Sequence, residues 1–561
     1  MPSTSPTPVR SRHRLAAVVL LALTALAYLP ALGNGFVWDD DTSVTASRAI
    51  HEPGGLARLW FSSRNPDYWP VTETTLWTEW RLWGMNAAGY HATNLALHLA
   101  EVFLIWILLR RLRIPGAWLG ALLFGLHPVN VESVAWITQR KNLMAMLFYL
   151  VSLGCFLRSD ETAEGDRRKS GAGWLVLSCA AFALAMLSKG SVAILPLVLI
   201  GLVAARRPFE IRDAVRLLPF FAIAGIFTLV DLQFQAHQLG AFEIIRRATP
   251  LERLLGAAAA VWFYLGKAVL PLHLSFVYPL WRIDPASLAW YLPLAAALGV
   301  TVWLCLSRRL RAVRLAWLYY GAALLPALGF ADAYFMKFSL VADHYQHLAL
   351  IGVTALAGAG WAAWRRRSRA ADAAAALVAG AFLVLTWRQC LLYRDSGRLF
   401  TDVLRKNPGS AMAHNNLGVV VAESRDLPAA LAQFQEALRL DPDYAEAERN
   451  AGLTLAREGR PAEAVSHYEA ALRLRPRYPD AWDDLGNALL AVGRPADAAN
   501  SFEQSLQLEP DNAEAEGNLG VALAQQGRAP EAIAHLEAAV RLDPANATLG
   551  KNLEMLRAAA H

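Results

Sequence analysis

Long apolar runs alternate with short polar connections from the N-terminus to about position 390. The first run, Leu15 to Leu32, holds eighteen residues. As a helix rising about 1.5 Å per residue it reaches roughly 27 Å, which is enough to cross the hydrocarbon core of a bilayer. Ten further runs lie at 93–109, 116–130, 142–157, 173–188, 190–204, 214–231, 286–306, 315–330, 346–363 and 371–388. The pattern therefore predicts an all-α bundle of about eleven membrane-spanning helices.

Basic residues that flank these runs predict an orientation. Arg10, Arg12 and Arg14 precede the first run, and the positive-inside rule places such residues in the cytoplasm. A cleaved signal peptide begins in the same way, but Ala31-Leu32-Gly33 is a poor cleavage site, so we expect a retained anchor. With eleven spans, every later basic cluster lies on the same side: Arg110, Arg111 and Arg113; Arg167, Arg168 and Lys169; Arg206 and Arg207; Arg308, Arg309 and Arg311; and Arg365, Arg366 and Arg367.

The apolar stretch from Leu251 to Leu270 could also cross a bilayer. If it did, the clusters at Arg308 and Arg365 would move outside, against the charge bias. We therefore expect a re-entrant or partly crossing element there. The first loop, 33–90, and the region after the last span are then both outside the cytoplasm.

A repeat of 34 residues runs through the C-terminal region. Its period is marked by Pro408, Pro442, Pro476, Pro510 and Pro544; by Gly418, Gly452, Gly486 and Gly520; by Ala430, Ala464, Ala498 and Ala532; and by Phe434, Tyr468, Phe502 and Leu536. This pattern is typical of tetratricopeptide helix pairs. The small residues let the two helices approach, the bulky residue fills the gap toward the next repeat, and proline ends the second helix.

The sequence thus predicts an α-solenoid of four full repeats, with a leading helix near Arg398 to Lys406 and a trailing one near Leu549 to Ala560. We expect a membrane domain over 1–397 and a repeat domain over 398–561. Stacks of this kind usually bind a peptide in their concave face, and the repeats contain no nucleophile, metal or phosphate motif. We expect them to bind a partner polypeptide and not to catalyse a reaction.

Composition fits a membrane protein, since 55% of the residues are hydrophobic and only 18% are charged. The net charge from Thr401 onward is −9, and that of the preceding part is +15, clustered at the ends of apolar runs. The overall +6 therefore does not indicate a nucleic-acid partner. The four cysteines have no metal-ligand or redox spacing, and His91 and His98 are interpreted as packing residues. We expect no cofactor and no tightly held metal.

Three carboxylates, Asp39, Asp40 and Asp41, follow the first span and lie at the external rim of the bilayer. Carboxylates in a largely apolar, partly dehydrated site have raised proton affinity, which suits them to proton abstraction near neutral pH. Acidic residues are, however, ordinary in external loops. The cluster becomes a candidate catalytic site only together with other external features.

The first of these features is a segment in which an acid, an aromatic residue and a base recur at regular steps. Glu132, Trp136 and Arg140 follow one another at four-residue steps, so on one helix they would share a face. Arg140 and Lys141 are predicted to lie on the external side, where the positive-inside rule does not favour basic residues. Their presence there indicates that they bind an anion. The alternative is a local network between Glu132 and Arg140 that only holds the loop.

Two further external features add polar groups. Asp343, His344 and Tyr345 open the tenth span, where polar residues are usually paired and often functional. Lys189 lies between two closely joined spans and adds a cation. We therefore include these four residues, with Glu132, Arg140 and Lys141, among the candidates for binding substrate or phosphate.

Six short motifs precede the repeats in this order: Phe36 to Asp41; Tyr68-Trp69-Pro70-Val71-Thr72; Gly89-Tyr90-His91; His127-Pro128-Val129; Glu132-Ser133-Val134-Ala135-Trp136-Ile137; and Ala342-Asp343-His344-Tyr345. Together with the repeats, this set resembles the transmembrane tetratricopeptide-repeat O-mannosyltransferases and their bacterial relatives. The resemblance implies the multispan glycosyltransferase fold called GT-C, in which a sugar on a polyprenyl phosphate is transferred at the external membrane face. It also implies an essential acid in the first external loop, here Asp39 and Asp40, with Asp41 as an extra carboxylate. Trp69 and His344 stand where many members of the family have arginine.

This resemblance leads to a hypothesis about function. Asp39 or Asp40 would accept the proton of a Ser or Thr hydroxyl as that hydroxyl attacks the sugar, mannose or another hexose. The nearby cations would neutralise the lipid phosphate, and the repeats would present the acceptor polypeptide. Two alternatives remain, namely a glycosyltransferase acting on lipid or glycan, and a non-catalytic membrane scaffold. External repeats without disulfides suit a bacterial inner membrane.

Overall fold

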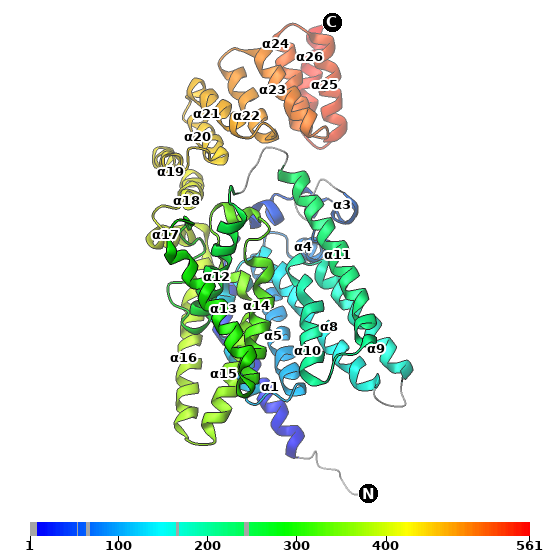
Figure 1. Ribbon diagram of the computed structural model, residues 1–561. Coiled ribbons are helices and arrows are strands. Elements are labelled where there is room, and N and C mark those ends of the chain that lie inside the picture. Colours follow the sequence, from blue (N-terminus) through cyan, green and yellow to red (C-terminus); the bar gives the residue numbers. More distant parts are fainter. Residues whose placement is uncertain (1–7, 53, 63–67, 164–167, 240–245, 561) are drawn as a thin grey trace. The chain divides into compact units, whose positions relative to one another are not determined.

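The computed structural model describes residues 8–52, 54–62, 68–163, 168–239 and 246–560, and all regular structure in this part is helical (Figure 1). The predicted all-α class is therefore confirmed. The chain divides into two compact units close to the predicted boundary, since the first ends at Asp402 and the second begins at Val403. The two units are called here the membrane unit and the repeat unit.

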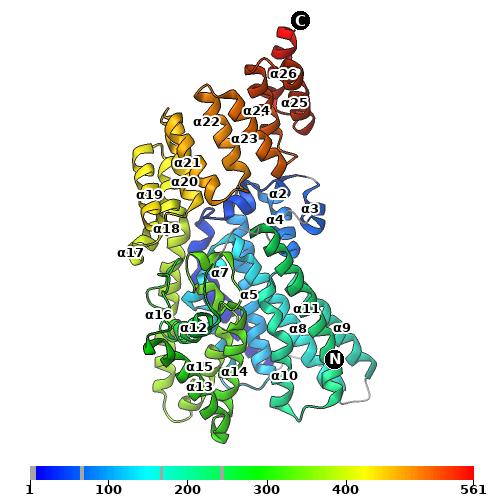
Figure 2. The same ribbon diagram turned by 45° about the horizontal axis from the view of Figure 1, so that its top comes forward.

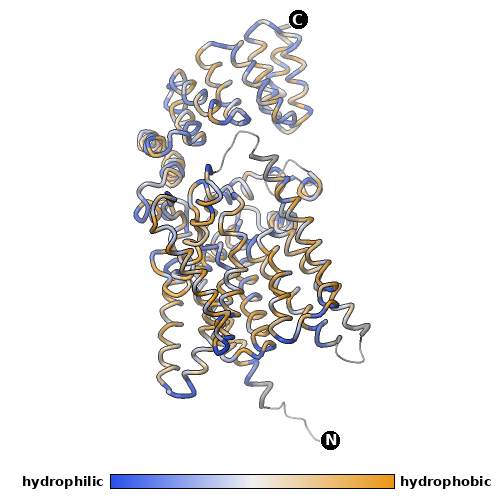
Figure 3. Tube along the Cα trace, in the orientation of Figure 1, coloured by the Kyte–Doolittle hydropathy of each residue, from blue (hydrophilic) through white to orange (hydrophobic). Residues whose placement is uncertain are grey.

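Each of the eleven predicted spans coincides with a helix of the membrane unit. These helices are α1 (Pro8–Tyr28), α5 (Ala87–Arg111), α6 (Ala117–Gly125), α8 (Arg140–Ala163), α9 (Arg168–Met186), α10 (Leu195–Arg206), α11 (Ile211–Leu239), α13 (Tyr291–Leu306), α14 (Arg311–Leu324), α15 (Leu350–Arg365) and α16 (Ala370–Cys390). Apolar residues dominate their middles and polar residues gather at their ends, as the tube in Figure 3 shows.

Six segments of the described chain are long and apolar enough to cross a membrane: Arg12–Gly33, Ala87–Arg111, Ile137–Glu161, Ile211–Phe234, Leu288–Leu306 and Ala370–Arg394. The other predicted spans correspond to shorter helices. The shortest, α6, has nine residues, because the polar and proline-containing stretch from His127 to Asn130 follows it closely. A total of eleven crossings stays a prediction.

The ambiguous stretch forms one continuous helix, α12 (Pro250–Val269), which is not among those six segments. Thr249 and Glu252 form a capping box at its start, in which each side chain bonds the other's backbone N–H. Glu252, Arg253 and Lys267 give it more charge than a simple span carries. The structure thus contains a single helix and no re-entrant helical pair here, while partial crossing stays a prediction.

The predicted first external loop is itself folded. It contains a π-helical turn (Asp41–Thr45) and the helices α2 (Arg48–His51), α3 (Gly55–Phe61) and α4 (Pro70–Trp83). An apolar cluster of Val44, Ile50, Leu59, Leu76, Tyr90 and Ile137 joins these elements to the starts of α5 and α8. The loop therefore packs over one end of the helix bundle and positions the carboxylates that precede its turn.

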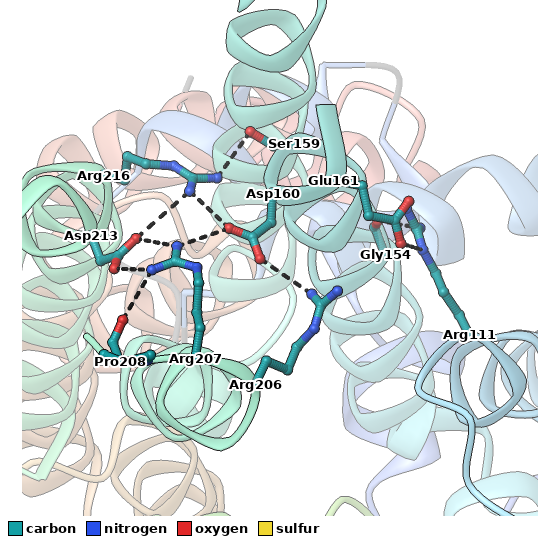
Figure 4. Close-up of polar contacts among 10 residues, drawn as sticks. All are labelled: Arg111, Gly154, Ser159, Asp160, Glu161, Arg206, Arg207, Pro208, Asp213 and Arg216. Atoms are coloured by element: carbon teal, nitrogen blue, oxygen red, sulfur yellow. Dashed lines mark hydrogen bonds and ion pairs between the residues drawn. The ribbon is translucent and has the colours of Figure 1, made fainter. Parts of the chain in front are cut away.

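Ion pairs tie together the ends of α8, α10 and α11 (Figure 4). The buried carboxylate of Asp160 lies 3.2 Å from Arg206, 3.2 Å from Arg207 and 3.0 Å from Arg216. Arg207 also pairs with Asp213 at 2.6 Å. One predicted basic cluster therefore has a structural role besides topology. Arg167 and the side chains of Arg168 and Lys169 lie outside the described residues.

The repeat unit consists of the four predicted helix pairs (Figures 1 and 2). They are α18 (Ala411–Glu423) with α19 (Leu427–Leu440), α20 (Ala445–Arg457) with α21 (Pro461–Leu474), α22 (Pro479–Ala491) with α23 (Pro495–Leu508), and α24 (Ala513–Gln525) with α25 (Ala529–Leu542). The leading helix α17 (Ser396–Lys406) and the trailing helix α26 (Ala547–Ala560) also form as predicted.

The glycines of the repeat explain how closely the paired helices approach. A Cβ atom at Gly418 would lie 2.6 Å from the ring of Phe434, and one at Gly486 would lie 2.6 Å from the ring of Phe502. The bulky residue of each pair therefore packs on the glycine of its own pair. No larger residue fits in place of the glycine, because even a methyl group there would overlap the ring.

Candidate active site

The aspartates follow a strained turn. Trp38 has φ of +50°, a left-handed conformation that is unfavourable for a residue with a side chain. Its ring packs at 5.3 Å from the ring of Trp136 and at 5.3 Å from that of Phe276, and its backbone N–H donates to Ser396 Oγ at 3.3 Å. This packing holds the turn and directs the next two carboxylates toward the start of α8.

Asp40 is fully buried and has both carboxylate oxygens engaged. One oxygen accepts the N–H of Val37 at 2.9 Å, and the other accepts the N–H of Thr138 at 2.9 Å. Burial raises the pKa of Asp40 to about 8, and the charge of Asp39 adds to the shift. Asp40 therefore links the turn to the segment before α8 and is largely protonated at neutral pH.

Asp39 is partly exposed. Its Oδ1 accepts the indole N–H of Trp136 at 2.8 Å and the hydroxyl of Thr138 at 2.7 Å. No hydrogen bond from another described residue reaches its Oδ2, which is called here the open oxygen. Removal from water raises the pKa of Asp39, and the charge of Lys141 and the two hydrogen bonds oppose that rise.

Asp41 differs from both of its neighbours. It is exposed, and its carboxylate accepts the hydroxyl of Thr45 at 3.1 Å within the π-helical turn. It therefore takes no part in the buried site. The three adjacent aspartates have three different environments, because the strained turn points each side chain in a different direction.

Thr138 was not singled out by the sequence, although it binds both aspartates. Its role depends on a break in the helix that was predicted over Glu132 to Arg140. The helix α7 (Val131–Ala135) stops before Trp136, whose backbone is extended with φ −108° and ψ 117°. A short 3-10 turn (Ile137–Gln139) then leads into α8. The prediction of one helix with Glu132, Trp136 and Arg140 on a shared face is therefore wrong. The break frees the Thr138 N–H to bind Asp40.

Arg140 is fully buried and engaged by the first loop and α5. Its guanidinium forms an ion pair with Glu79, donates to Asn94 Oδ1 at 2.8 Å and donates to the Tyr90 carbonyl at 2.9 Å. The alternative of a Glu132–Arg140 network is therefore wrong, because each residue has a different partner. Since a buried paired guanidinium is not presented to a ligand, we assign Arg140 a positioning role.

Lys141 and Lys189 are two partly exposed cations at this end of the bundle. The Lys141 ammonium lies 4.2 Å from the centre of the Trp69 ring and 5.9 Å from that of Trp136, a cation–π arrangement. Lys189 Nζ donates to Asn142 Oδ1 at 2.7 Å. Both ammonium groups act electrostatically on the imidazole of His344, and the ammonium of Lys189 also acts on the carboxyl group of Glu132.

The remaining candidates form a second polar group. Glu132 Oε2 accepts the backbone N–H of His344 at 2.9 Å, and Glu132 Oε1 lies 3.0 Å from His344 Nδ1. Asp343 Oδ1 accepts the hydroxyl of Tyr278 at 2.9 Å. The ring of Tyr345 lies 4.4 Å from that of His344, which in turn lies 5.9 Å from Trp136. Trp136 thus contacts both this group and Asp39.

Within the described residues, no group of three or more His, Cys, Asp and Glu side chains has the arrangement of a metal site. His98, one of the two histidines interpreted as packing residues, contacts Glu101 Oε2 at 3.3 Å and the Gly125 carbonyl at 3.2 Å. His91 contacts the Gly35 carbonyl at 3.3 Å. The absence of a metal from the working protein stays a prediction.

Known proteins are similar to this chain both in the repeats and in the membrane unit. Family models of the tetratricopeptide repeat match residues 392–445 and 484–547, and 443–511. The solved tetratricopeptide-repeat protein YrrB, described as having an unusual peptide-binding site, is 27% identical over 29% of this chain and 84% of its own, with a TM-score of 0.27.

The curated relatives match a longer stretch. The protein O-mannosyl-transferase TMTC4 of Mus musculus is 24% identical over 75% of this chain and 66% of its own length. The human TMTC4 is 23% identical over 75% of this chain and 65% of its own. The chain thus spans slightly less than two thirds of these relatives. It is a relative of the transmembrane tetratricopeptide-repeat O-mannosyltransferases, with tetratricopeptide repeats at its C-terminal end.

Proposed function

We propose that this protein is an integral membrane glycosyltransferase that moves a hexose from a polyprenyl phosphate to a Ser or Thr hydroxyl of a polypeptide outside the cytoplasm. One observation carries the proposal: Oδ1 of Asp39 is held by two hydrogen bonds, Oδ2 receives none from another described residue, and the ammonium of Lys141 is close enough to act on this carboxylate. Mannose is the favoured sugar, because the relatives are named O-mannosyltransferases.

In this reaction Asp39 is the general base. The acceptor hydroxyl gives its proton to the open oxygen of Asp39 while its own oxygen attacks the anomeric carbon, and the bond from that carbon to the phosphate oxygen breaks. Thr138 and Trp136 hold the other oxygen of Asp39 in place. Asp40 is a positioning residue, because its buried carboxyl fixes the turn through two backbone N–H groups.

Positive charge is needed where the phosphate departs. Lys141 and Lys189 supply it, since both are partly exposed and both act electrostatically on His344. Charge stabilisation of this kind is stronger beside buried apolar and aromatic side chains than in bulk water. Arg140 has no direct part in this step and keeps the first loop in place.

The repeats present the acceptor polypeptide. The first helices of successive pairs, α18, α20, α22 and α24, contact one another along the stack, which places them on its inner side. An inner face of this kind offers an extended surface to a polypeptide. This assignment is part of the proposal, as is an orientation with the N-terminus in the cytoplasm.

The test is transfer of a radiolabelled sugar from a polyprenyl phosphate by the purified full-length protein. We expect Asp39→Asn to lower kcat by about 10²- to 10⁴-fold, the usual contribution of a general base. Asp41→Asn is the matched control, because it removes a neighbouring exposed carboxylate, and it should stay within about twofold of the unchanged protein. Equal transfer by Asp39→Asn and the unchanged protein would exclude the proposed base. Label that partitions with lipid and resists protease would exclude a polypeptide acceptor.

A further inference from the structure

Lys141 differs from the other cations of the candidate site in what surrounds its charge. The guanidinium of Arg140 is ion-paired, and the ammonium of Lys189 donates to an amide oxygen. Within the described part of the chain Lys141 forms neither a hydrogen bond nor an ion pair, and its ammonium lies 4.2 Å from the centre of the Trp69 ring and 5.9 Å from that of Trp136. The charge is therefore held by aromatic rings and is not neutralised by a contacting acid.

The Trp69 ring is held in place from a second part of the chain. Trp69 caps the start of α4, and the first turn of this helix is bound to the segment that follows α9. The Val71 N–H donates to the Leu187 carbonyl at 3.3 Å, and the Thr72 hydroxyl donates to the Ser188 carbonyl at 3.2 Å. An indole has few rotatable bonds, whereas the lysine side chain is long and flexible. The position of the ring therefore does not depend on Lys141.

Trp136 connects the same ammonium to the proposed base. Its ring is buried, and its indole N–H donates to Asp39 Oδ1 at 2.8 Å. The charge of Lys141 acts on Asp39, although the two side chains are not in ion-pair contact. A contact ion pair at a partly exposed site and a cation–π contact are of similar strength. The aromatic contacts are therefore strong enough to keep the ammonium near the carboxylate without pairing with it.

We propose that Trp69 is a positioning residue that holds the ammonium of Lys141 off Asp39 and available to the phosphate of the lipid-linked donor. This inference rests on the proposed glycosyl transfer. The departing phosphate gains negative charge as its bond to the sugar breaks, so an unpaired ammonium with three N–H donors stabilises the transition state more than the bound donor. An ammonium paired with Asp39 would weaken both the base and the cation. Trp69 acts through Lys141 and not on the reacting atoms.

The test is a double-mutant cycle on kcat/KM for the donor, measured with the full-length protein. Trp69→Leu removes the ring and should lower kcat/KM by about 2- to 30-fold, the range that the strength of a cation–π contact implies. Lys141→Met removes the charge itself and should lower it at least as much. Because Trp69 acts through Lys141, the double variant should be no slower than Lys141→Met alone. Losses that add would overturn the inference.

The pH profile gives a readout that a structural role of Trp69 would not move. Without the ring the ammonium pairs with Asp39, and a contacting cation lowers the pKa of a carboxyl group. The base then stays ionised to lower pH, so the acid limb of the kcat/KM profile in Trp69→Leu should move to lower pH. In Lys141→Met the charge that lowers the pKa of Asp39 is gone, and the limb should move to higher pH. A shift to higher pH in Trp69→Leu, or no shift, would overturn the inference.

Two further variants serve as controls. Trp69→Phe keeps a ring that binds a cation less strongly than indole does, so it should lose less than Trp69→Leu and show the same non-additivity with Lys141→Met. It replaces Trp69→Leu if that variant does not fold. Trp77→Leu removes the other cation–π contact of α4, in which the Arg81 guanidinium lies 3.4 Å from the centre of the Trp77 ring. Its effect should add to that of Lys141→Met and leave the acid limb in place.

Binding of farnesyl phosphate separates this inference from the proposed function, because binding requires no transfer. Calorimetry in detergent should show weaker binding by Trp69→Leu and by Lys141→Met, and no further loss in the double variant. This binding pattern without sugar transfer by the unchanged protein would overturn the proposed function and leave the assignment of Trp69 standing. Transfer together with additive losses would overturn the assignment and leave the function standing. Neither binding nor transfer by the unchanged protein would overturn both.

Discussion

The repeat unit and the end of the membrane unit that contains the candidate site are both helical, yet different contacts hold them. In the repeat unit one contact recurs in every pair, as between Gly418 and Phe434. At the site no contact recurs, and several polar contacts join distant parts of the chain, such as that of Thr138 with Asp40. A periodic pattern therefore determines the packing of the repeats, whereas a few long-range hydrogen bonds determine the geometry of the site.

The largest effect on stability is expected from a substitution that breaks the buried polar network. Arg140→Met leaves Glu79 buried without its partner, and such a change typically costs about 3–5 kcal/mol of stability. Thermal unfolding of the full-length protein in detergent measures it. Arg365→Met is the matched control, because the Arg365–Asp372 pair is about half exposed and is worth at most about 1 kcal/mol. Equal shifts in both variants would show that the buried pair contributes no more to stability than the exposed one.

A smaller effect is expected at the residue shared by the two aspartates. Thr138→Val keeps the backbone N–H to Asp40 but removes the hydroxyl that donates to Asp39. A hydrogen bond to a charged group is worth about 1.5–3 kcal/mol, so the catalytic rate should fall by roughly 10- to 100-fold.

The same variant should also change the pH dependence. The hydroxyl lowers the pKa of Asp39, so its removal raises that pKa further. Because the base must be ionised, activity is lost as pH falls through the pKa, and the acid limb of the rate profile should move to higher pH. An acid limb that stays in place would exclude Asp39 as the group that titrates.

The smallest effect is expected within the periodic packing. Gly486→Ala places a methyl group 2.6 Å from the ring of Phe502, which should cost about 1–3 kcal/mol. Gly550→Ala in α26 meets nothing within 4 Å and should stabilise its helix by about 0.5–1 kcal/mol. Limited proteolysis of the repeats in the full-length protein measures both. Changes of the same sign would show that glycine at position 486 is not required by packing.

The same difference explains what could be predicted from the sequence. The 34-residue period predicts every helix pair of the repeat unit, because each pair places its small and bulky residues at the same offsets. Apolar runs likewise predict where the helices of the membrane unit lie. Both features are local or periodic, so a single sequence contains them.

The geometry of the site could be predicted only in part. The position of the acids beyond the first span was visible, but the different environments of Asp39, Asp40 and Asp41 depend on a left-handed turn at Trp38. The break at Trp136 was missed, because helical spacing of its neighbours suggested a continuous helix. Glu79 could not be identified as the partner of Arg140, since nothing in either local pattern records a contact across 61 positions.

The Thr138 contacts have a consequence for how the substrates are aligned. Thr138 anchors the proposed base, and Lys141, the cation proposed to attract the phosphate, follows three residues later at the start of α8. A donor bound at Lys141 would therefore contact the helix that directly follows the 3-10 turn from which Thr138 holds Asp39. In the proposed reaction, binding of the donor phosphate and alignment of the base therefore depend on the same short segment of chain.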